Sequence, residues 1–325
     1  MAIIVGDIHG NLNKVKAFLG YKPDELHIAL GDYVDSFFES SERQEEALQL
    51  LINSAAILIW GNHDLAYLKF PPFGCSGYQG SNSIVHSIIE NNKKRFHAAY
   101  SVDGWLISHA GVQEGLVKTT NIDKLAAMLN ERMADFINNP RKMTDSIFNV
   151  GIGRGGLSRC GGIFWFDFLR ECCLSTKVKQ IFGHTEIKEP FVTETYINLD
   201  TTNSLDTCYL FDTQTNEIVT IKMTKRKIIV ITDKITTQGM LYWGFADSQQ
   251  LVIVAAKTAQ EAWKKGVVFW HTGQTITPLG VLPLNAREIS HRRIYNYDQK
   301  TIWISGPKSN AYFFEELNEE SETGA

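Results

Sequence analysis

Hydrophobic and polar positions along the first part of the chain predict strands that alternate with helices. Residues 2–5 form a short, β-prone apolar run, and residues 12–19 then carry apolar side chains at helical spacing. The same order recurs with predicted strands at 26–30 and 56–60 and a helix at 43–52 between them. Three strands that alternate with helices predict an α/β sheet with right-handed crossovers.

The alternation continues to about residue 222. Short apolar runs predict strands at 105–107 and 180–182, and residues 122–137 read as an amphipathic helix. Residues 151–162 are rich in glycine and predict a loop. Further strands are predicted at 191–199, 208–211 and 218–223. We therefore expect one domain over residues 1–222.

The pattern changes after residue 222. We expect a small α+β accessory domain at 223–314 and an acidic, disordered tail at 315–325. The β-prone runs of this domain are 228–232, 240–245 and 251–256, and one helix is predicted at 258–265. Its tryptophans are expected in its core. No chemistry is assigned to this domain, although it could bind a partner.

Composition narrows the class of protein. The chain has 325 residues, of which 44% are hydrophobic and 21% charged, as in globular proteins. Its longest apolar stretches fall short of the roughly 20 residues that cross a bilayer, so no membrane partner is expected. A formal charge of −4 gives no attraction to nucleic acid, which is expected only as a substrate.

Cysteine usage bears on the compartment. Five cysteines make an odd count and none lies in a C-x-x-C pair, so neither a disulfide framework nor a thiolate zinc site is predicted. The first residues show no secretory leader. We therefore expect a reducing, cytoplasmic location.

Five polar motifs each follow a predicted strand: Gly-Asp-x-His-Gly, Gly-Asp-x-x-Asp, Gly-Asn-His-Asp, Ser-His-Ala-Gly and Gly-His-Thr. The loops past the carboxyl ends of strands in α/β sheets gather in one crevice, so these side chains can meet. Carboxylates, imidazoles and an amide oxygen are ligands for Mn²⁺ or a transition metal and do not suit a calcium cage. The candidate metal ligands and catalytic residues in the motifs are Asp7, His9, Asp32, Asp35, Asn62, His63, His109 and His184.

Any one of these residues has an ordinary structural explanation. A single aspartate at a strand end is more often a helix cap or turn former, and a single histidine is more often a hydrogen-bonded core residue. The ordered series of five motifs is what favours a metal site. With this many ligands, a pair of ions bridged by a carboxylate is expected.

The series resembles that of the calcineurin-like metallophosphoesterases, and within them the phosphoprotein phosphatase branch with its bacterial and phage lambda-type enzymes. The resemblance covers roughly residues 3–222, and the segments at 180–185 and 196–200 look like the final catalytic segment of that branch. It implies two mixed β-sheets sandwiched between helices. It also implies two divalent metal ions, with Mn²⁺ expected first and iron or zinc as alternatives.

The resemblance also implies roles for the motif residues. Asp7 and His9 would hold the first metal, and Asp32 would bridge to the second, with a metal-bridging hydroxide attacking phosphorus. His63 would be the general acid, oriented and kept charged by Asp35. The second site would be completed by Asn62, His109 and His184. A single histidine after Gly183, where many superfamily members have two, favours the phosphoprotein phosphatase branch.

Two arginines common in this branch are missing. The second motif usually continues Asp-Arg-Gly, but Ser36 follows Asp35 here, and Trp60 stands where many relatives have an arginine before Gly-Asn-His. A replacement phosphate ligand is Arg154 in Gly-Arg-Gly-Gly. The alternative is a surface loop with a solvated arginine.

Three functional hypotheses follow. The first is a phosphomonoesterase, a serine/threonine or dual-specificity protein phosphatase whose substrates are phosphorylated proteins or small phosphate esters. The second keeps the chemistry but takes a nucleotide, a dinucleoside polyphosphate, a cyclic nucleotide or an RNA end. The third is a binding module without turnover.

Overall fold

The computed structural model describes most of residues 1–223 and the strands that follow. The described ranges are 1–36, Glu39, 41–75, Tyr78, 82–140, 145–202 and 207–223. For residue 42 and for everything beyond 223, side chains are outside the description. Contacts divide the chain into two compact units, Met1–Ser36 with Arg43–Met223 and Phe37–Glu42 with Thr224–Ala325.

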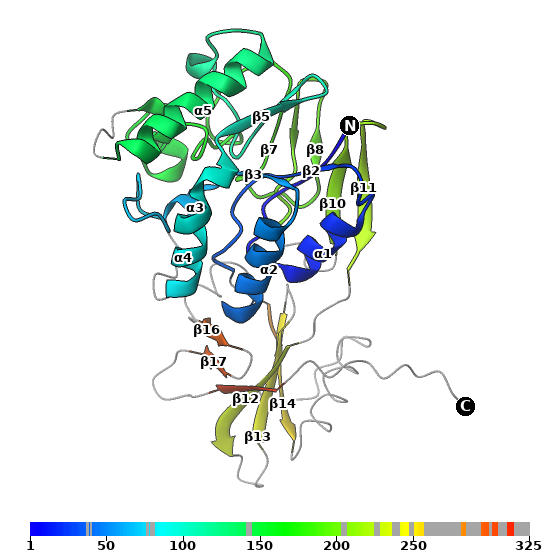
Figure 1. The fold of residues 1–325 in the computed structure, drawn as a ribbon. Coiled ribbons are helices and arrows are strands. Elements are labelled where there is room, and N and C mark those ends of the chain that lie inside the picture. Colours follow the sequence, from blue (N-terminus) through cyan, green and yellow to red (C-terminus); the bar gives the residue numbers. More distant parts are fainter. Residues whose placement is uncertain are drawn as a thin grey trace. The chain divides into compact units, whose positions relative to one another are not determined.

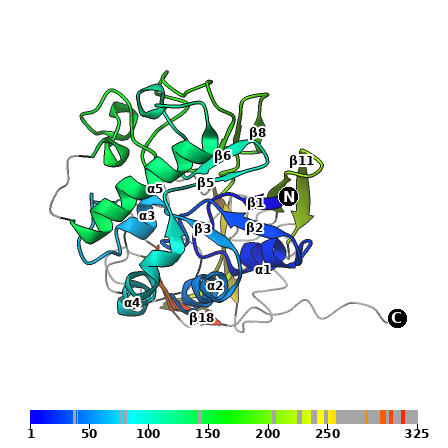
Figure 2. The same cartoon turned by 45° about the horizontal axis from the view of Figure 1, so that its top comes forward.

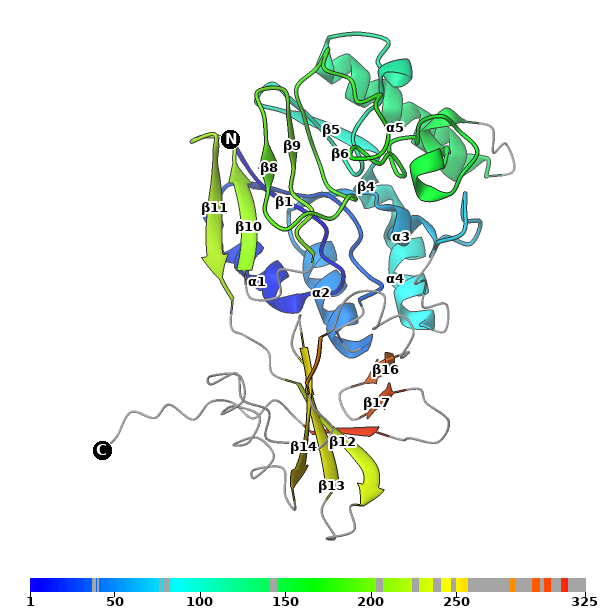
Figure 3. The same ribbon diagram turned by 180° about the vertical axis from the view of Figure 1, so that it is seen from behind.

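The first unit contains a six-stranded sheet with the order β11-β10-β1-β2-β3-β4. The strands β1 to β4 run parallel, whereas β10 pairs with both β1 and β11 in antiparallel fashion. Figure 3 shows the β10–β11 hairpin beside β1. The bounds are β1 Ala2–Val5, β2 Leu26–Ala29, β3 Ile57–Ile59, β4 Phe96–His97, β10 Thr207–Asp212 and β11 Glu217–Lys222.

A second, five-stranded sheet has the order β5-β6-β7-β9-β8. The strands β6, β7 and β9 are parallel, and the two edge strands are antiparallel to their neighbours. Both sheets are therefore mixed. The bounds are β5 Ala99–Val102, β6 Trp105–Ser108, β7 Gln180–Phe182, β8 Phe191–Val192 and β9 Tyr196–Asn198.

The two sheets lie face to face, with helices on their outer sides. Alternate residues of β1 enter different cores: Ala2 and Ile4 pack with Ile107 and Ile181 of the second sheet, whereas the side chains between them face the helices. Figure 2 shows α5 on one side of the strands and α1 and α2 on the other. The predicted fold class, two mixed sheets flanked by helices, is confirmed for this unit.

Local sequence explains where the helices begin. The side chains of Asn11, Asn82 and Asn121 accept hydrogen bonds from backbone N–H groups three residues further on, which caps α1, α4 and α5. The helix bounds are α1 Leu12–Gly20, α2 Ser41–Asn53, α3 Asn62–Leu65, α4 Ser83–Asn92 and α5 Ile122–Asn138 (Figure 1). Short 3₁₀ turns occur at Lys93–Arg95, Glu114–Leu116, Ser146–Phe148 and Ile152–Arg154.

The second unit is described only by its strands, which form a seven-stranded antiparallel sheet of order β15-β14-β13-β12-β18-β17-β16. The helix predicted at 258–265 and the tail at 315–325 lie outside the described residues. The bounds are β12 Ile228–Ile235, β13 Leu241–Ala246, β14 Gln250–Ala256, β15 Val281–Pro283, β16 Ile294–Asp298, β17 Thr301–Ile304 and β18 Ala311–Phe314.

Most predicted elements of the first unit occur close to their expected positions. The single strand predicted at 191–199 is two short strands, β8 and β9, because the backbone turns between them and Thr193 bonds back to Tyr196. The helix α4 and the strand β5 were not predicted from the sequence pattern. Among the described helices, none combines the length and the apolar character that a membrane crossing requires.

Candidate active site

The predicted site residues follow the carboxyl ends of five parallel strands that belong to both sheets. Asp7 and His9 follow β1, and Asp32 and Asp35 follow β2. Asn62 and His63 open α3 directly after β3, His109 follows β6 and His184 follows β7. The two facing sheets thus deliver their loops to one place, as expected for α/β proteins.

Two groups of ligand atoms share one carboxylate. His9, Asp32 and His63 have ligand atoms within 4.8 Å of one another, and so do Asp32, His109 and His184. The same oxygen, Oδ2 of Asp32, lies 3.7 Å from Nε2 of His9 and 3.6 Å from Nε2 of His109. An oxygen between two imidazoles is the position expected of a bridging carboxylate.

The imidazoles are set up to accept a cation. Nδ1 of His9 lies 3.0 Å from the Val34 carbonyl, and Nδ1 of His109 lies 2.8 Å from the Leu30 carbonyl. Because a carbonyl only accepts, each Nδ1 carries the proton and each neutral ring turns the lone pair of Nε2 toward Asp32. Facing lone pairs and a carboxylate repel one another unless a cation lies between them, so these residues fit a metal.

Burial disfavours the charged form of three site histidines. It lowers the pKa of His9 and of His109, and it lowers the pKa of His184 well below its usual range, with the neighbouring His109 and Arg154 adding to the effect. For Asp32, burial opposes ionisation, but its interactions with His109, His63 and His9 and the hydrogen bond from the His63 backbone N–H outweigh it and lower its pKa. Neutral imidazoles and an ionised carboxylate are the protonation states that bind metals.

Asp7 belongs to neither of the two groups. Its buried carboxylate accepts the backbone N–H of His184 at 3.1 Å, which ties the loop after β7 to the loop after β1. Burial, together with the charges of Asp200 and Asp32, raises its pKa well above the usual range. A cation beside these carboxylates would offset that repulsion. A Cβ at Gly183 would lie 2.0 Å from Oδ1 of Asp7, so only glycine allows this approach.

Several site residues have strained backbones. His9, Asp32, Asp35 and His184 have φ of 42°, 50°, 62° and 66°, in the left-handed region that favours glycine. Such conformations cost on the order of 1–3 kcal/mol each and persist where the surrounding structure enforces them. Among the described residues, three further non-glycine positions outside the site, Lys22, Asp103 and Asn216, also have positive φ, so the strain is consistent with a functional site and does not by itself define one.

His63 and Asp35 form the predicted pair. Nδ1 of His63 lies 2.7 Å from Oδ2 of Asp35, and the hydroxyl of Tyr67 donates to Oδ1 of Asp35 at 2.5 Å. Burial disfavours the charged imidazole, but Asp32 and the hydrogen bond with Asp35 overcome this and raise the pKa of His63 well above its usual range. This pairing favours the charged form of the His63 imidazole.

Asp64 is a residue whose role the sequence analysis missed. Its fully buried carboxylate accepts the backbone N–H groups of Asp32 and Tyr33 at 2.8 Å and of Gly61 at 2.9 Å. It therefore fixes the loop after β2 against the loop after β3. A signal was present, because Asp64 is the last residue of the Gly-Asn-His-Asp motif.

Arg154 lies beside the second ligand group. Its Nη2 donates to the backbone carbonyl of His184 and to the Thr185 hydroxyl, both at 3.2 Å, and its Nε lies 3.0 Å from the buried carboxylate of Asp167. The alternative of a solvated surface arginine does not describe these contacts. Asp167 belongs to the Trp-x-Asp segment, but the sequence alone did not link it to Arg154.

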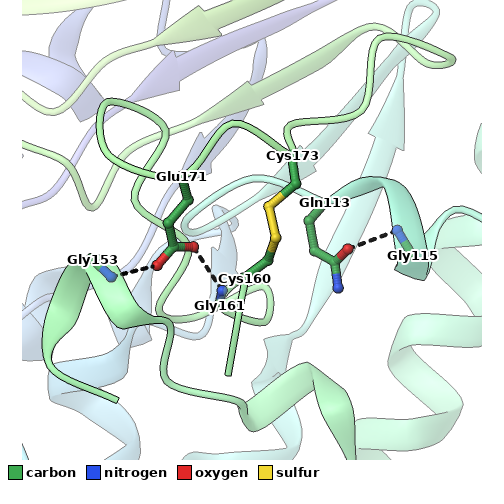
Figure 4. The surroundings of a disulfide bond; sticks show 7 residues. All are labelled: Gln113, Gly115, Gly153, Cys160, Gly161, Glu171 and Cys173. Atoms are coloured by element: carbon green, nitrogen blue, oxygen red, sulfur yellow. Dashed lines mark hydrogen bonds between the residues drawn. A yellow bond between two sulfur atoms is a disulfide. The ribbon is translucent and has the colours of Figure 1, made fainter. Parts of the chain in front are cut away.

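The loop that carries Arg154 is held by side chains. The carboxylate of Glu171 accepts the backbone N–H of Gly153 at 3.1 Å and that of Gly161 at 2.7 Å, next to a disulfide between Cys160 and Cys173 (Figure 4). The two cysteine Cα atoms are 6.7 Å apart. These contacts add to a short backbone pairing within the loop, in which Ile152 N–H donates to the Ser158 carbonyl at 2.9 Å.

The disulfide corrects the expectation drawn from cysteine count and spacing. The remaining cysteines, Cys75, Cys172 and Cys208, keep their thiols, so the odd count conceals one pair. The partners are thirteen residues apart, in a loop whose path the sequence pattern did not show. Pairing depends on that path and on Cα separation, neither of which spacing alone reveals.

The two positions that lack arginine are occupied by buried residues. Trp60 is fully buried and stacks on Phe96 with ring centroids 4.3 Å apart, and Ser36 is 6% exposed, with its backbone N–H bonded to Gln44. A tryptophan packed in this way cannot take over the phosphate contact of an arginine.

Comparisons with known proteins place the chain in a family. No curated protein matches the chain. Among solved structures, a metallophosphoesterase from Sphaerobacter thermophilus is similar at 12% sequence identity with a TM-score of 0.26, covering 84% of this chain and 94% of that one. The family model for calcineurin-like phosphoesterases matches residues 2–187, which include every predicted site residue. The chain belongs to the calcineurin-like phosphoesterase family.

Proposed function

We propose that the chain is a phosphomonoesterase with two divalent metal ions, and that it acts as a serine/threonine or dual-specificity protein phosphatase. The observation that carries the proposal is the His63–Asp35 pair at 2.7 Å, placed beside the carboxylate that both ligand groups share. Family membership supports a phosphoester hydrolase. The monoester and the protein substrate are our inference from the site.

The metal ligands are assigned from the two groups together with the family resemblance, which adds Asp7 and makes His63 the general acid. Asp7, His9 and Asp32 would hold one ion. Asp32, Asn62, His109 and His184 would hold the other, and this set of oxygens and imidazoles accepts Mn²⁺, iron or zinc. When bound, the ions supply positive charge for the phosphoryl oxygens and lower the pKa of a water nucleophile.

His63 would donate a proton to the leaving oxygen. The alkoxide of serine or threonine is strongly basic and leaves poorly unless it is protonated, whereas the leaving group of a phosphate anhydride needs less help. A histidine held in its charged form by two carboxylates therefore favours an aliphatic phosphate ester. This is the reason for placing protein phosphatase ahead of nucleotide hydrolase.

Arg154 would bind the phosphoryl group. Its side chain is 27% exposed, and Asp167 and the His184 loop fix its position. A fixed, planar guanidinium offers paired N–H donors to phosphate oxygens. Asp167 is the residue that positions it.

A substrate panel tests the proposal. Metal-stripped protein, restored with Mn²⁺, is assayed on a phosphoserine peptide, an aryl phosphate monoester, its diester and a dinucleoside polyphosphate. We expect turnover of both monoesters. A preference for the anhydride would replace the protein substrate by a nucleotide, and a preference for the diester would overturn the monoesterase.

The His63→Asn variant sharpens the same panel. Because an aryl oxide leaves more easily than an alkoxide, the loss of the general acid should cost more on the phosphoserine peptide than on the aryl phosphate. Equal losses on the two substrates would remove His63 from that role. Full activity of the variant on both would contradict the assignment altogether.

A further inference from the structure

The amide of Asn62 has two ends with opposite hydrogen-bonding character. Its Oδ1 lies 2.9 Å from Nε2 of His109 and 2.8 Å from Nδ1 of His184, and its Nδ2 donates to Sγ of Cys75 at 3.2 Å. The side chain is only 2% exposed, so water does not compete for either end. The direction of the amide is decided by these partners.

Only one direction of the amide allows metal binding. The oxygen end offers a lone pair beside the lone pair of His109 Nε2, whereas the nitrogen end carries two hydrogens and no free pair. A metal ligand must therefore point Oδ1 at the imidazoles. The observed orientation is the one that binds.

A reversed Asn62 amide could form hydrogen bonds with the neighbouring histidines in the absence of a metal. Turned by 180°, the two N–H groups of Asn62 would point at the nitrogens of His109 and His184 and could donate hydrogen bonds to them. The metal-free site would then be stabilised in a closed, non-binding form. Something on the other side of Asn62 has to oppose this reversal.

The sulfur of Cys75 occupies that other side. It accepts from Nδ2. Reversal of the amide would break this bond and leave only the weak S–H donor of the thiol for the amide oxygen. The Cys75 sulfur reaches Asn62 from the loop after α3. We propose that Cys75 is a positioning residue that selects the metal-binding direction of the Asn62 amide.

The inference rests on the proposed metal site and is tested by metal affinity. Mn²⁺ binding to the metal-stripped full chain is measured by calorimetry for the wild type and for Cys75→Ala, Cys75→Ser and Cys172→Ala. Loss of a residue that orients a metal ligand typically weakens metal binding about 10-fold or more. We therefore expect Cys75→Ala to bind Mn²⁺ about 10-fold more weakly at one of its two sites. Cys75→Ser keeps an acceptor and should recover most of the affinity.

Cys172→Ala is the matched control. Cys172 is exposed and outside the site, so the same removal of sulfur there should leave both affinities unchanged. Melting of the metal-free proteins is compared in parallel. A drop in metal affinity with unchanged metal-free stability separates positioning from a general loss of packing.

A double-mutant cycle provides the decisive readout. In Asn62→Asp both ends of the side chain are oxygens, so its direction no longer matters. The further change Cys75→Ala should then alter Mn²⁺ affinity much less than it does in the wild type. An equal loss in both backgrounds would overturn the inference.

The outcomes separate this inference from the proposed function. If the wild type binds two ions and Cys75→Ala binds them equally well, the role of Cys75 is wrong and the metal site stands. If the wild type binds no divalent ion, both fall together. Weak binding by Cys75→Ser as well as by Cys75→Ala would show that packing by sulfur, and not its acceptor role, is what counts.

Discussion

The loops that carry the metal ligands and the loop that carries Arg154 are positioned in different ways. The ligand loops are direct continuations of paired strands, and Asp64 and Asp7 join them through backbone N–H groups. The loop around Arg154 is held by its own backbone hydrogen bonds, by the carboxylates of Glu171 and Asp167 and by a disulfide. The first arrangement continues the strands of the sheets, whereas the second adds side-chain and disulfide contacts to a local backbone turn.

The largest effect is expected where the two ligand groups meet. Asp32→Asn removes the shared carboxylate charge but keeps the size of the side chain, so both ions should bind poorly and turnover should be lost. Metal content by elemental analysis and activity on an aryl phosphate measure this. A variant that kept two ions and normal turnover would contradict the bridging role of Asp32.

The next effect concerns the general acid. The pKa of His63 is raised, so the acid form persists as pH rises and kcat/KM should fall only when pH passes that raised value. Asp35→Asn removes a partner that favours the charged ring, so the alkaline limb should move to lower pH and kcat should fall by about 100- to 10,000-fold.

Tyr67→Phe is the matched change for the pH profile. It removes the hydroxyl bonded to Asp35 but leaves the carboxylate, so its alkaline limb should shift less than that of Asp35→Asn. Profiles of kcat/KM between weakly acidic and alkaline pH give the comparison. If the alkaline limb did not move in Asp35→Asn, the limb would not report the titration of His63 in its pair with Asp35.

A smaller effect is expected at the second region. Arg154→Ala should lower kcat/KM on a phosphate monoester by about 100-fold, as for loss of one charged or polar donor to the transition state, and should leave metal content unchanged. Arg154→Lys keeps the positive charge but lacks the planar guanidinium, so its kcat/KM should lie between those of the wild type and Arg154→Ala. The exposed Arg159 of the same loop gives the control, Arg159→Ala, with near-normal kinetics expected. Normal kinetics in Arg154→Ala would return the loop to a structural role.

The smallest effect on catalysis is expected from opening the disulfide. Cys160→Ser should lower the free energy of unfolding by about 3 kcal/mol, because the bond closes a short loop. Since Glu171 and Asp167 still hold the loop, KM should rise less than in Arg154→Ala, and metal affinity should not change. Thermal melting with and without a dithiol reductant, together with KM, measures both. A loss of metal binding on reduction would show that the metal-ligand loops depend on the disulfide-bonded loop.

The sequence by itself determined the sheet-borne half of this protein. A β-prone run followed by a polar motif implies a loop at the carboxyl end of a strand, and strands of parallel sheets present those ends together. His109 and His184 could therefore be assigned to one site although 75 residues separate them. The end of a strand at which a loop lies, and the face to which each side chain points, follow from the local sequence, so the placement of these residues could be predicted.

Only the tertiary structure decided which side chains support the site. The contacts of Asp167 with Arg154, of Glu171 with two glycine N–H groups and of Cys75 with Asn62 join loops that have no sheet register between them. Nothing in their local sequence specifies a partner. Such pairings depend on how irregular segments pack once the sheets have formed, and only the folded chain determines that.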